Sequence, residues 1–295
     1  MNTIIDLIGN TPLVRLNHIN ANDQVTIYGK LEGQNPGGSV KDRTAFGLIS
    51  DAIKKGKLSS GDTIVEATSG NTGIAIAMIA REYGIKVKLI MPDNATAERI
   101  ITMKAYGAEI ILTPSERTIE YSRELALEMS EKEGYHILNQ FDNPANPQVH
   151  IDTTGPEIWK DTAGRVTHFV SSMGTTGTII GTSKYLKSKN PNIKIIGAQP
   201  TDGSRIPGIR RWSPEFLPGI FEAKWVDQKM DVSTSQATHY ARLLAEKEGI
   251  MGGMSSGGAA YIATQVAQKI DSGVIVFIVC DRGDRYLSSD LYRRV

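Results

Sequence analysis

The chain has 295 residues, of which 40% are hydrophobic, so it can form one large or two ordinary domains with substantial apolar cores. Its 33 basic and 32 acidic side chains leave a net charge of +1, which provides no overall field to attract nucleic acid or an anionic membrane. The sequence opens without a basic and apolar leader and contains no membrane-length apolar run. We therefore expect a cytoplasmic protein that acts on small molecules.

Cysteine and histidine usage argues against a metal centre. Cys280 is the only cysteine, which excludes an internal disulfide and every cysteine-based zinc pattern. The five histidines form no H-E-x-x-H motif. We expect no metal site.

Short segments rich in Val and Ile alternate with helix-period stretches along the chain. The predicted strands are residues 25–32, 63–67, 86–92, 108–112, 167–173, 193–200 and 274–280. The predicted helices are residues 40–55, 71–83, 97–106, 115–133, 176–187, 235–248 and 258–270. Nearly continuous apolarity in the strands indicates parallel sheets that helices cover on both faces. The number of strands favours two α/β layers, with a crossing near residues 141–147, and the proline-rich stretch 200–231 suggests a functional loop.

Polar, glycine-containing loops follow four of these strands or helices, and the first is "NPGGSVKDR", residues 35–43. Ser39 and Asp42 predict an N-cap and capping box, which puts Lys41 in the first turn of a helix. A helix N-terminus and burial both favour an uncharged amine, which is a nucleophile able to form a Schiff base. The alternative is an ordinary solvated lysine.

The second loop is "EATSGNTGIA", residues 66–75. Its residues from Thr68 to Thr72 offer several N–H and hydroxyl donors near the start of a predicted helix. A small carboxylate would fit there, although a turn with an N-cap would give the same pattern.

The third loop is "SSMGTTGTIIG", residues 171–181. Glycines, threonine hydroxyls and a helix start at one point suit a phosphate dianion. The chain contains neither a Walker A motif nor a G-x-G-x-x-G fingerprint. The loop therefore predicts a phosphorylated cofactor that is not a nucleotide.

The fourth loop, "GGMSSGGAA" at residues 252–260, formally matches the G-x-S-x-G nucleophile elbow of hydrolases. The last histidine, His239, precedes Ser255, whereas the elbow order requires a histidine after the serine. We therefore interpret Ser255 as a helix cap or as a hydrogen-bond partner for a ligand.

These four motifs in this order resemble the cysteine synthases of the fold-type-II pyridoxal-phosphate enzymes, over residues 8–288. The segments "PGIRRW" (207–212) and "CDRGDRYLS" (280–288) are similar to the B-type members. The resemblance implies two open parallel-sheet α/β domains with the active site between them. Residues 1–34 plus 146–295 would form the larger, cofactor-binding domain, and residues 35–145 the smaller, mobile domain.

The resemblance also implies roles for individual residues. Lys41 would hold pyridoxal 5'-phosphate as an imine, Asn71 would bind the ring hydroxyl, and Ser255 would face the pyridine nitrogen. A neutral serine there makes the cofactor a weaker electron sink, which favours β-elimination. The implied phosphate-binding residues are Gly174, Thr175, Thr176, Gly177 and Thr178, and the implied binders of the substrate carboxylate are Thr68, Ser69, Thr72 and Gln140.

The implied reaction is a ping-pong β-replacement through an α-aminoacrylate, with Lys41 as the general base. Acetate in O-acetyl-L-serine would be replaced by sulfide to give L-cysteine, or by thiosulfate to give S-sulfo-L-cysteine. Arg210 and Arg211 would either attract such an anion to the mouth of the site or form a solvated pair. Cys280 is expected to have no catalytic role, and the family suggests a homodimer. Alternatives are a serine or threonine dehydratase of the same fold and a catalytically silent binding partner.

Overall fold

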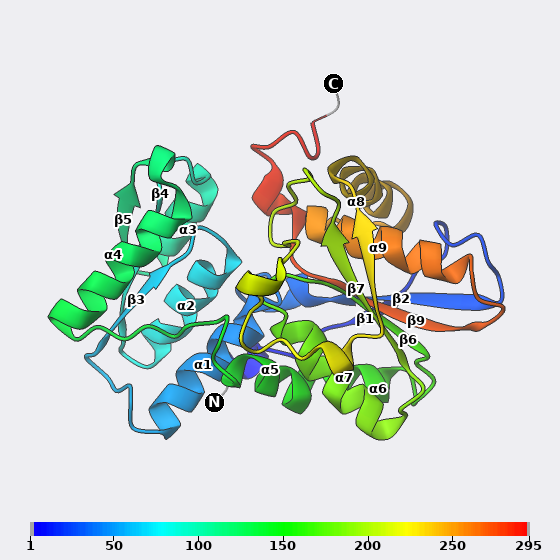
Figure 1. Ribbon diagram of the computed structural model, residues 1–295, viewed down its shortest axis with the longest axis horizontal. Helices are drawn as coiled ribbons and strands as arrows, with labels where there is room; N and C mark the ends of the chain where they lie inside the picture. The colour runs from blue at the N-terminus through cyan, green and yellow to red at the C-terminus, as the bar shows by residue number, and fades with distance from the viewer. Residues whose placement is uncertain (1–2, 294–295) are drawn as a thin grey trace.

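The computed structural model describes residues 3–293 and contains two β-sheets, which lie in different parts of the molecule (Figure 1). The larger sheet has the strand order β1-β2-β9-β6-β7-β8 and is parallel except for β1. Its strands are β1 (Leu13–Arg15), β2 (Val25–Leu31), β6 (His168–Ser172), β7 (Lys194–Pro200), β8 (Gln228–Val232) and β9 (Gly273–Val279). The predicted fold class is confirmed.

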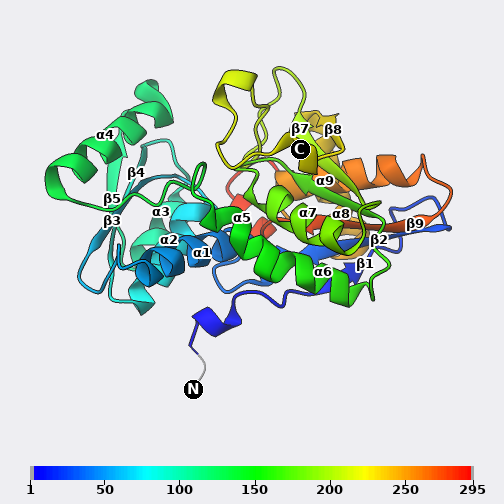
Figure 2. The same ribbon diagram turned by 60° about the horizontal axis from the view of Figure 1, so that its bottom comes forward.

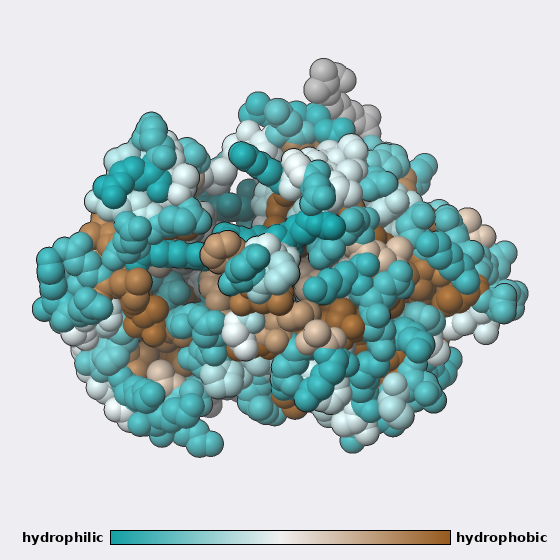
Figure 3. All heavy atoms as spheres, in the orientation of Figure 1, coloured by the Kyte–Doolittle hydropathy of each residue, from teal (hydrophilic) through white to brown (hydrophobic). Residues whose placement is uncertain are grey.

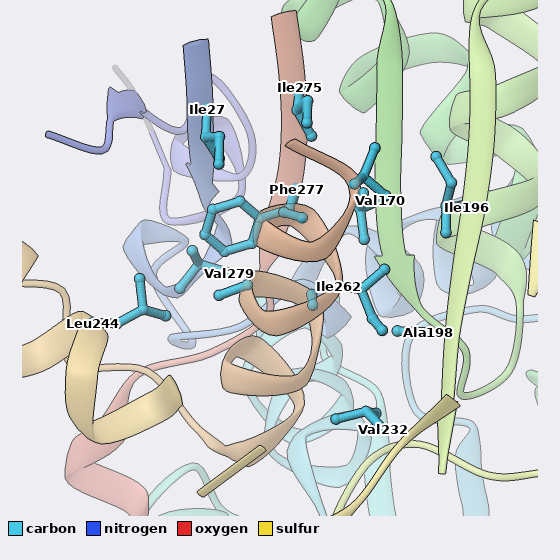
Figure 4. Packing of buried hydrophobic residues seen from close by; sticks show 14 of the residues in the cluster. Ile27, Val170, Ile196, Ala198, Val232, Leu244, Ile262, Ile275, Phe277 and Val279 are labelled. Carbon is cyan, nitrogen blue, oxygen red and sulfur yellow. The ribbon is translucent and has the colours of Figure 1, made fainter. Parts of the chain in front are cut away.

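Apolar cores lie on both faces of the larger sheet because neighbouring residues of a strand point to opposite faces. Along β9, Ile275 and Phe277 join Ile262 of α9 in one core (Figure 4), whereas Val276 and Ile278 join the core on the other face. This pattern explains the continuous apolar run of "VIVFIV" in a strand that helices cover on both sides.

Helices cover the two faces of this sheet. One face carries α8 (Thr234–Glu248) and α9 (Met254–Ala267). The other carries α5 (Ala145–Val149), α6 (Gly155–Asp161) and α7 (Gly177–Lys189), which lie together in Figure 2. A π-helical turn, His150–Thr154, connects α5 and α6 without interrupting the chain's helical course.

The smaller sheet has the order β3-β4-β5 and is entirely parallel. Its strands are β3 (Thr63–Ala67), β4 (Lys86–Pro92) and β5 (Glu109–Thr113). On one face, α4 (Thr118–Glu133) packs against Val65 and Ile90. On the other lie α2 (Asn71–Glu82) and α3 (Ala97–Ala105), with a core that also includes Leu48 and Ile49 of α1 (Lys41–Lys54).

The helix α1 links the two parts of the molecule and lies between them in Figure 1. Its body packs in the core of the smaller sheet, but Arg43 in its first turn is buried in an ion cluster with the larger part. The Arg43 guanidinium contacts Glu32, which follows β2, at 2.7 Å, and Glu157 of α6 at 2.7 Å. Lys30 of β2 also contacts Glu157, at 2.8 Å, so the start of α1 is fixed to the larger sheet.

The structure departs from the sequence-based expectations at a few elements. The strands β1 and β8 were not predicted; β1 has three residues, and β8 has an exposed burial pattern. The capping box at Ser39 and Asp42 is wrong, because Val40 is the N-cap and the Asp42 carboxylate accepts the Gly37 N–H at 2.5 Å. Ser39 still supports the helix start, since its hydroxyl oxygen accepts the Lys41 N–H at 3.2 Å.

Short 3-10 helices occupy Ile5–Leu7, Glu32–Gln34, Ser115–Arg117, Pro214–Phe216, Ala223–Trp225 and Gly283–Tyr286. Among the helices in residues 3–293, none is long and apolar enough to cross a membrane. The same residues contain no cluster of three or more His, Cys, Asp or Glu side chains suited to a metal ion.

Candidate active site

A cavity of about 340 Å³ lies where the two parts of the molecule meet, and the surface is hollowed there (Figure 3). Its walls come from the start of α1, the loops after β3 and β6, the first turn of α9, and the segment after β9. These are carboxyl ends of parallel strands and helix N-termini, which is where α/β sheets bind ligands. Most of the predicted site residues line this one cavity: Lys41, Thr68, Ser69, Asn71, Thr72, Gln140, Gly174, Thr175, Thr176, Thr178, Arg210 and Ser255.

Lys41 is the first residue of α1 and lines the cavity. Burial lowers the pKa of its amine, and the neighbouring Asp281 carboxylate opposes this shift only in part. A lysine with a lowered pKa has a larger uncharged fraction at neutral pH, so it is available as a nucleophile and as a base.

The loop between β3 and α2 forms a wall of donors, as predicted. Thr68, Ser69 and Thr72 line the cavity here, and the Thr72 hydroxyl donates to Gln140 Oε1 at 2.9 Å. This hydrogen bond joins two of the predicted carboxylate-binding residues across 68 positions of sequence. The wall therefore offers neutral hydroxyl and amide groups for a small carboxylate.

The loop after β6 has free donors at the start of α7. Thr176 is the N-cap, with a φ of 71°, and makes no side-chain capping hydrogen bond to the helix. Its hydroxyl is buried without a partner in residues 3–293. The Gly177 N–H donates to Thr175 Oγ1 at 3.4 Å, whereas the next two N–H groups of the turn have no acceptor among these residues. A Cβ at Gly174 would lie 2.5 Å from the Gly208 carbonyl oxygen, so only glycine fits there. An anion would satisfy these orphaned groups.

Gly177 is buried behind this loop and does not line the cavity. A side chain at this position would overlap Oδ1 of Asn146. The Asn146 amide in turn donates to the Gln140 carbonyl at 2.7 Å and to Thr175 Oγ1 at 3.2 Å. Asn146 thus joins Gln140 of the donor wall to the loop Gly174–Thr178, which we call the phosphate loop. Asn146 was not predicted, because its only signal in the sequence is the "NPANP" turn.

His150, in the π-helical turn, supports the same loop from behind. Its Nε2 lies 3.2 Å from Thr178 Oγ1, and its Nδ1 lies 2.8 Å from Thr154 Oγ1. Burial, together with the nearby Arg43 charge, lowers the pKa of His150 to about 3, so the ring is neutral. A lone histidine in sequence gives no sign of such a role.

Ser255 lies in the first turn of α9, one residue inside the helix rather than at its N-cap, which is Gly253. Cys280 and Asp281 line the cavity beside it. Burial, reinforced by Asp281, raises the pKa of the Cys280 thiol to about 11, so it stays protonated. This supports the expectation that Cys280 is not a nucleophile.

Asp281 is a second unpredicted residue of the site. Its buried carboxylate accepts hydrogen bonds from Asn71 Nδ2 at 2.7 Å, Gly253 N–H at 3.1 Å and the Tyr286 hydroxyl at 2.7 Å. The other end of the Asn71 amide accepts from Arg285. The orientation of Asn71 is therefore fixed by residues from the C-terminal segment of the chain.

The two arginines of "PGIRRW" have different surroundings. Arg210 lines the cavity, which agrees with the first of the two expected alternatives. The structure does not bring Arg211 there: its guanidinium pairs with Asp202 at 2.9 Å and Asp231 at 2.7 Å, outside the cavity. Those two carboxylates satisfy its charge, which removes the reason to expect an incoming anion at Arg211.

One cavity thus contains a lysine whose amine has a lowered pKa and a glycine- and threonine-rich loop suited to a phosphate group. These two features together indicate an enzyme that holds a phosphorylated cofactor through a lysine. The family of pyridoxal-phosphate dependent enzymes matches residues 4–281, and the chain belongs to this family. Within it, the chain is 53% identical over 292 residues to cysteine synthase B of Salmonella typhimurium, covering 99% of this chain and 96% of that protein. The predicted resemblance and the predicted cofactor are thereby confirmed.

Solved structures agree with this assignment. A cysteine synthase from Entamoeba histolytica superposes with a TM-score of 0.94 at 38% identity, covering 100% of this chain and 91% of that one. An O-ureido-L-serine synthase superposes with a TM-score of 0.93 at 38% identity, covering 99% of this chain and 95% of that one. The same fold therefore serves enzymes that are named for different products.

Proposed function

We propose that the chain is a cysteine synthase of the B type, which replaces acetate in O-acetyl-L-serine by a sulfur nucleophile. The observation that carries the proposal is that Lys41, the donor wall around Thr72 and the unpartnered hydroxyl of Thr176 share one cavity. An amino-acid substrate that reacts with pyridoxal 5'-phosphate requires an amine, a site for the substrate carboxylate and a site for the cofactor phosphate. The similarity to cysteine synthase B supports the choice of reaction.

The residues present fit the cofactor. The loop Gly174–Thr178 would hold its phosphate, Lys41 its aldehyde carbon, and Ser255 and Asn71 its ring, although Gly177 would act by allowing the loop to pack against Asn146. When bound, pyridoxal 5'-phosphate supplies an electron sink for the bond between the substrate's α-carbon and its hydrogen.

Lys41 is the base of the proposed reaction. Its amine takes the α-proton of O-acetylserine while acetate leaves the β-carbon, and it returns that proton to the α-carbon after sulfur has added. A lowered pKa suits both transfers, because the amine must be uncharged before it can accept the proton.

The donor wall orients the substrate. Thr68, Ser69, Thr72 and Gln140 would bind the α-carboxylate, and the Thr72 to Gln140 hydrogen bond holds two of them in one arrangement. Movement of the smaller part, residues 35–145, toward the larger would exclude water from the reacting atoms. Both the domain bounds and this movement are part of the proposal.

Sulfide would give L-cysteine and thiosulfate would give S-sulfo-L-cysteine. Thiosulfate use is supported by Arg210, which lines the cavity and forms no salt bridge within the described residues. In that reaction the outer sulfur of thiosulfate bonds to the β-carbon, and acetate leaves with the electron pair of the broken bond. The two negative charges of thiosulfate are then carried by acetate and by the sulfonate group of the product.

Assays of the purified holoenzyme with O-acetylserine test the proposal. We expect cysteine with sulfide and S-sulfocysteine with thiosulfate, each with one equivalent of acetate. Pyruvate and ammonia without a sulfur-containing amino acid would instead identify a dehydratase. Protein that binds no pyridoxal 5'-phosphate would support a silent binding partner.

A homodimer in the cytoplasm completes the proposal. It rests on the resemblance to cysteine synthases, and light scattering of the purified protein measures the oligomeric state.

A further inference from the structure

Two arginines from different parts of the molecule line the same cavity. Arg123 projects from α4, which covers the smaller sheet, and Arg210 from the loop after β7 of the larger sheet. Both line the cavity. Arg123 was not singled out by its sequence context, "EYSRELALEM", which has the pattern of an ordinary amphipathic helix.

A pair of aromatic rings holds the two guanidinium groups in place. The Arg123 Cζ lies 5.1 Å from the centre of the Phe141 ring, and the Arg210 Cζ lies 5.5 Å from that of Trp212. Phe141 and Trp212 contact each other edge to face, with 5.8 Å between ring centres. Trp212 is itself fixed, since its Nε1 donates to the Gly174 carbonyl at 2.9 Å. Stacking on aromatic rings orders arginine side chains without satisfying their N–H donors.

Neither guanidinium has a carboxylate to neutralise it directly. Within residues 3–293 no salt bridge is formed by Arg123 or Arg210, whereas the adjacent Arg211 has two. The Glu120 carboxylate interacts at longer range with both arginines, and that of Glu66 with Arg123, but neither glutamate lines the cavity. Burial and the nearby Arg123 charge lower the pKa of Arg210, and the Glu120 charge offsets this only in part.

The charges that line the cavity leave an excess for one more anion. Its described walls contain three arginines, Arg99, Arg123 and Arg210, and a single carboxylate, Asp281, which is occupied by three hydrogen bonds. The phosphate loop and the donor wall bind their anions through neutral groups, so they do not need these charges.

We propose that Arg123 is a specificity-determining residue for the second substrate, and that it holds an oxyanion such as thiosulfate together with Arg210 across the mouth. This inference rests on the proposed function. Two guanidinium groups at one cavity suit an anion with several oxygens, since each can donate two parallel hydrogen bonds. Sulfide has no oxygens to accept them, so its reaction does not depend on Arg123.

The test compares R123Q with R117Q in the holoenzyme. Arg117 is a matched control because it also stacks on an aromatic ring, that of Tyr121, but does not line the cavity. For R123Q we expect kcat/KM for thiosulfate to fall roughly tenfold to a hundredfold, as for loss of a charge-assisted hydrogen bond. We expect kcat/KM for sulfide, and acetate release before acceptor is added, to stay within about twofold, and R123K to recover part of the thiosulfate activity. R117Q should match the wild type with both acceptors.

Titration calorimetry with thiosulfate gives a second readout that needs no turnover. The wild type should bind this anion more tightly than R123Q, and the difference should shrink as ionic strength rises. Equal losses with sulfide and thiosulfate, or unchanged thiosulfate kinetics and binding in R123Q, would overturn the inference and leave cysteine synthesis intact. Failure of the wild type to form cysteine from sulfide would overturn the proposed function instead, and the calorimetric comparison would still decide the role of Arg123.

Discussion

The side-chain amide of Asn71 donates a 2.7 Å hydrogen bond to the carboxylate of Asp281, and the two residues come from different parts of the molecule. Asn71 begins α2 beside the smaller sheet, and Asp281 lies two residues after β9 of the larger one. The contact therefore joins the two parts of the molecule at the cavity, where a residue proposed to bind the cofactor ring is held in one orientation.

This relationship predicts the effect of D281N. The substituted amide would face donors with its own N–H groups, so at least one of the three hydrogen bonds to residue 281 is lost. We expect the free energy of unfolding to fall by about 1–3 kcal/mol and cofactor affinity to fall with it. Urea unfolding and titration of the apoenzyme with pyridoxal 5'-phosphate measure both, and unchanged values for both would contradict the role given to Asp281.

Replacing Lys41 with alanine removes the proposed base. We expect kcat to fall by a factor of about 10²–10⁴. K55A is a matched control, because Lys55 lies just beyond the same helix and is half-exposed beside Asp51. Cysteine formation measures the rate, and borohydride reduction followed by mass spectrometry should label the wild type and K55A but not K41A at this residue. A K41A enzyme with the native rate would refute the mechanism.

Gly177 predicts a packing defect with a specific partner. In G177A the added methyl group overlaps Oδ1 of Asn146, and overpacking of this kind costs about 1–3 kcal/mol. We expect lower stability and weaker cofactor binding in thermal and absorbance titrations. Because the clash needs the Asn146 side chain, N146A should cost less in the G177A background than in the wild type. Additive losses would show that the clash is not the cause.

Arg43 predicts both a stability loss and a change in acid sensitivity. R43M leaves the buried Glu32 without its salt-bridge partner and the half-buried Glu157 with Lys30 alone, and breaking such a buried pair costs about 3–5 kcal/mol. Although burial raises the pKa of Glu157, Arg43 and Lys30 outweigh this effect and lower the pKa from 4.5 to about 2.

The sign of the pH effect follows from that lowered pKa. A carboxylate with a lower pKa in the folded state stabilises the protein above pH 4.5, and this contribution is lost as the pH falls toward about 2. Urea unfolding of the wild type should show this decline, and R43M should show a smaller one. An equally steep acid dependence in R43M would mean that Arg43 does not set the Glu157 pKa.

Much of the fold was predictable because the apolar pattern of each helix or strand lies within its own short segment of sequence. Runs such as "VIVFIV" are buried on both faces, so their apolarity marks a parallel strand without knowledge of its neighbours. The edge strand β8, "QKMDV", is mostly exposed and lacks this mark. The segment from α5 to α6 was missed because Pro147, Gly155 and Pro156 are helix-breaking signals that tertiary packing overrides here.

The site was predictable where one loop carries several donors, as around Thr72 and Thr176. Residues that act through distant contacts were not. Asn146 meets Thr175 across 29 positions, and Asp281 meets Asn71 across 210. Arg211 was misplaced because sequence shows a pair of arginines but not the aspartates that neutralise one of them.

The salt bridges of Arg43 fix the first turn of α1, which contains Lys41, so any rotation of this helix would pivot about that end. The helix has 14 residues, so at 1.5 Å per residue its far end lies about 20 Å from the anchored turn. In the domain movement proposed above, displacement would grow along this length and be smallest at the start. The Lys41 nitrogen would thus stay aligned with the loop Gly174–Thr178 while the opposite wall of the cavity moves.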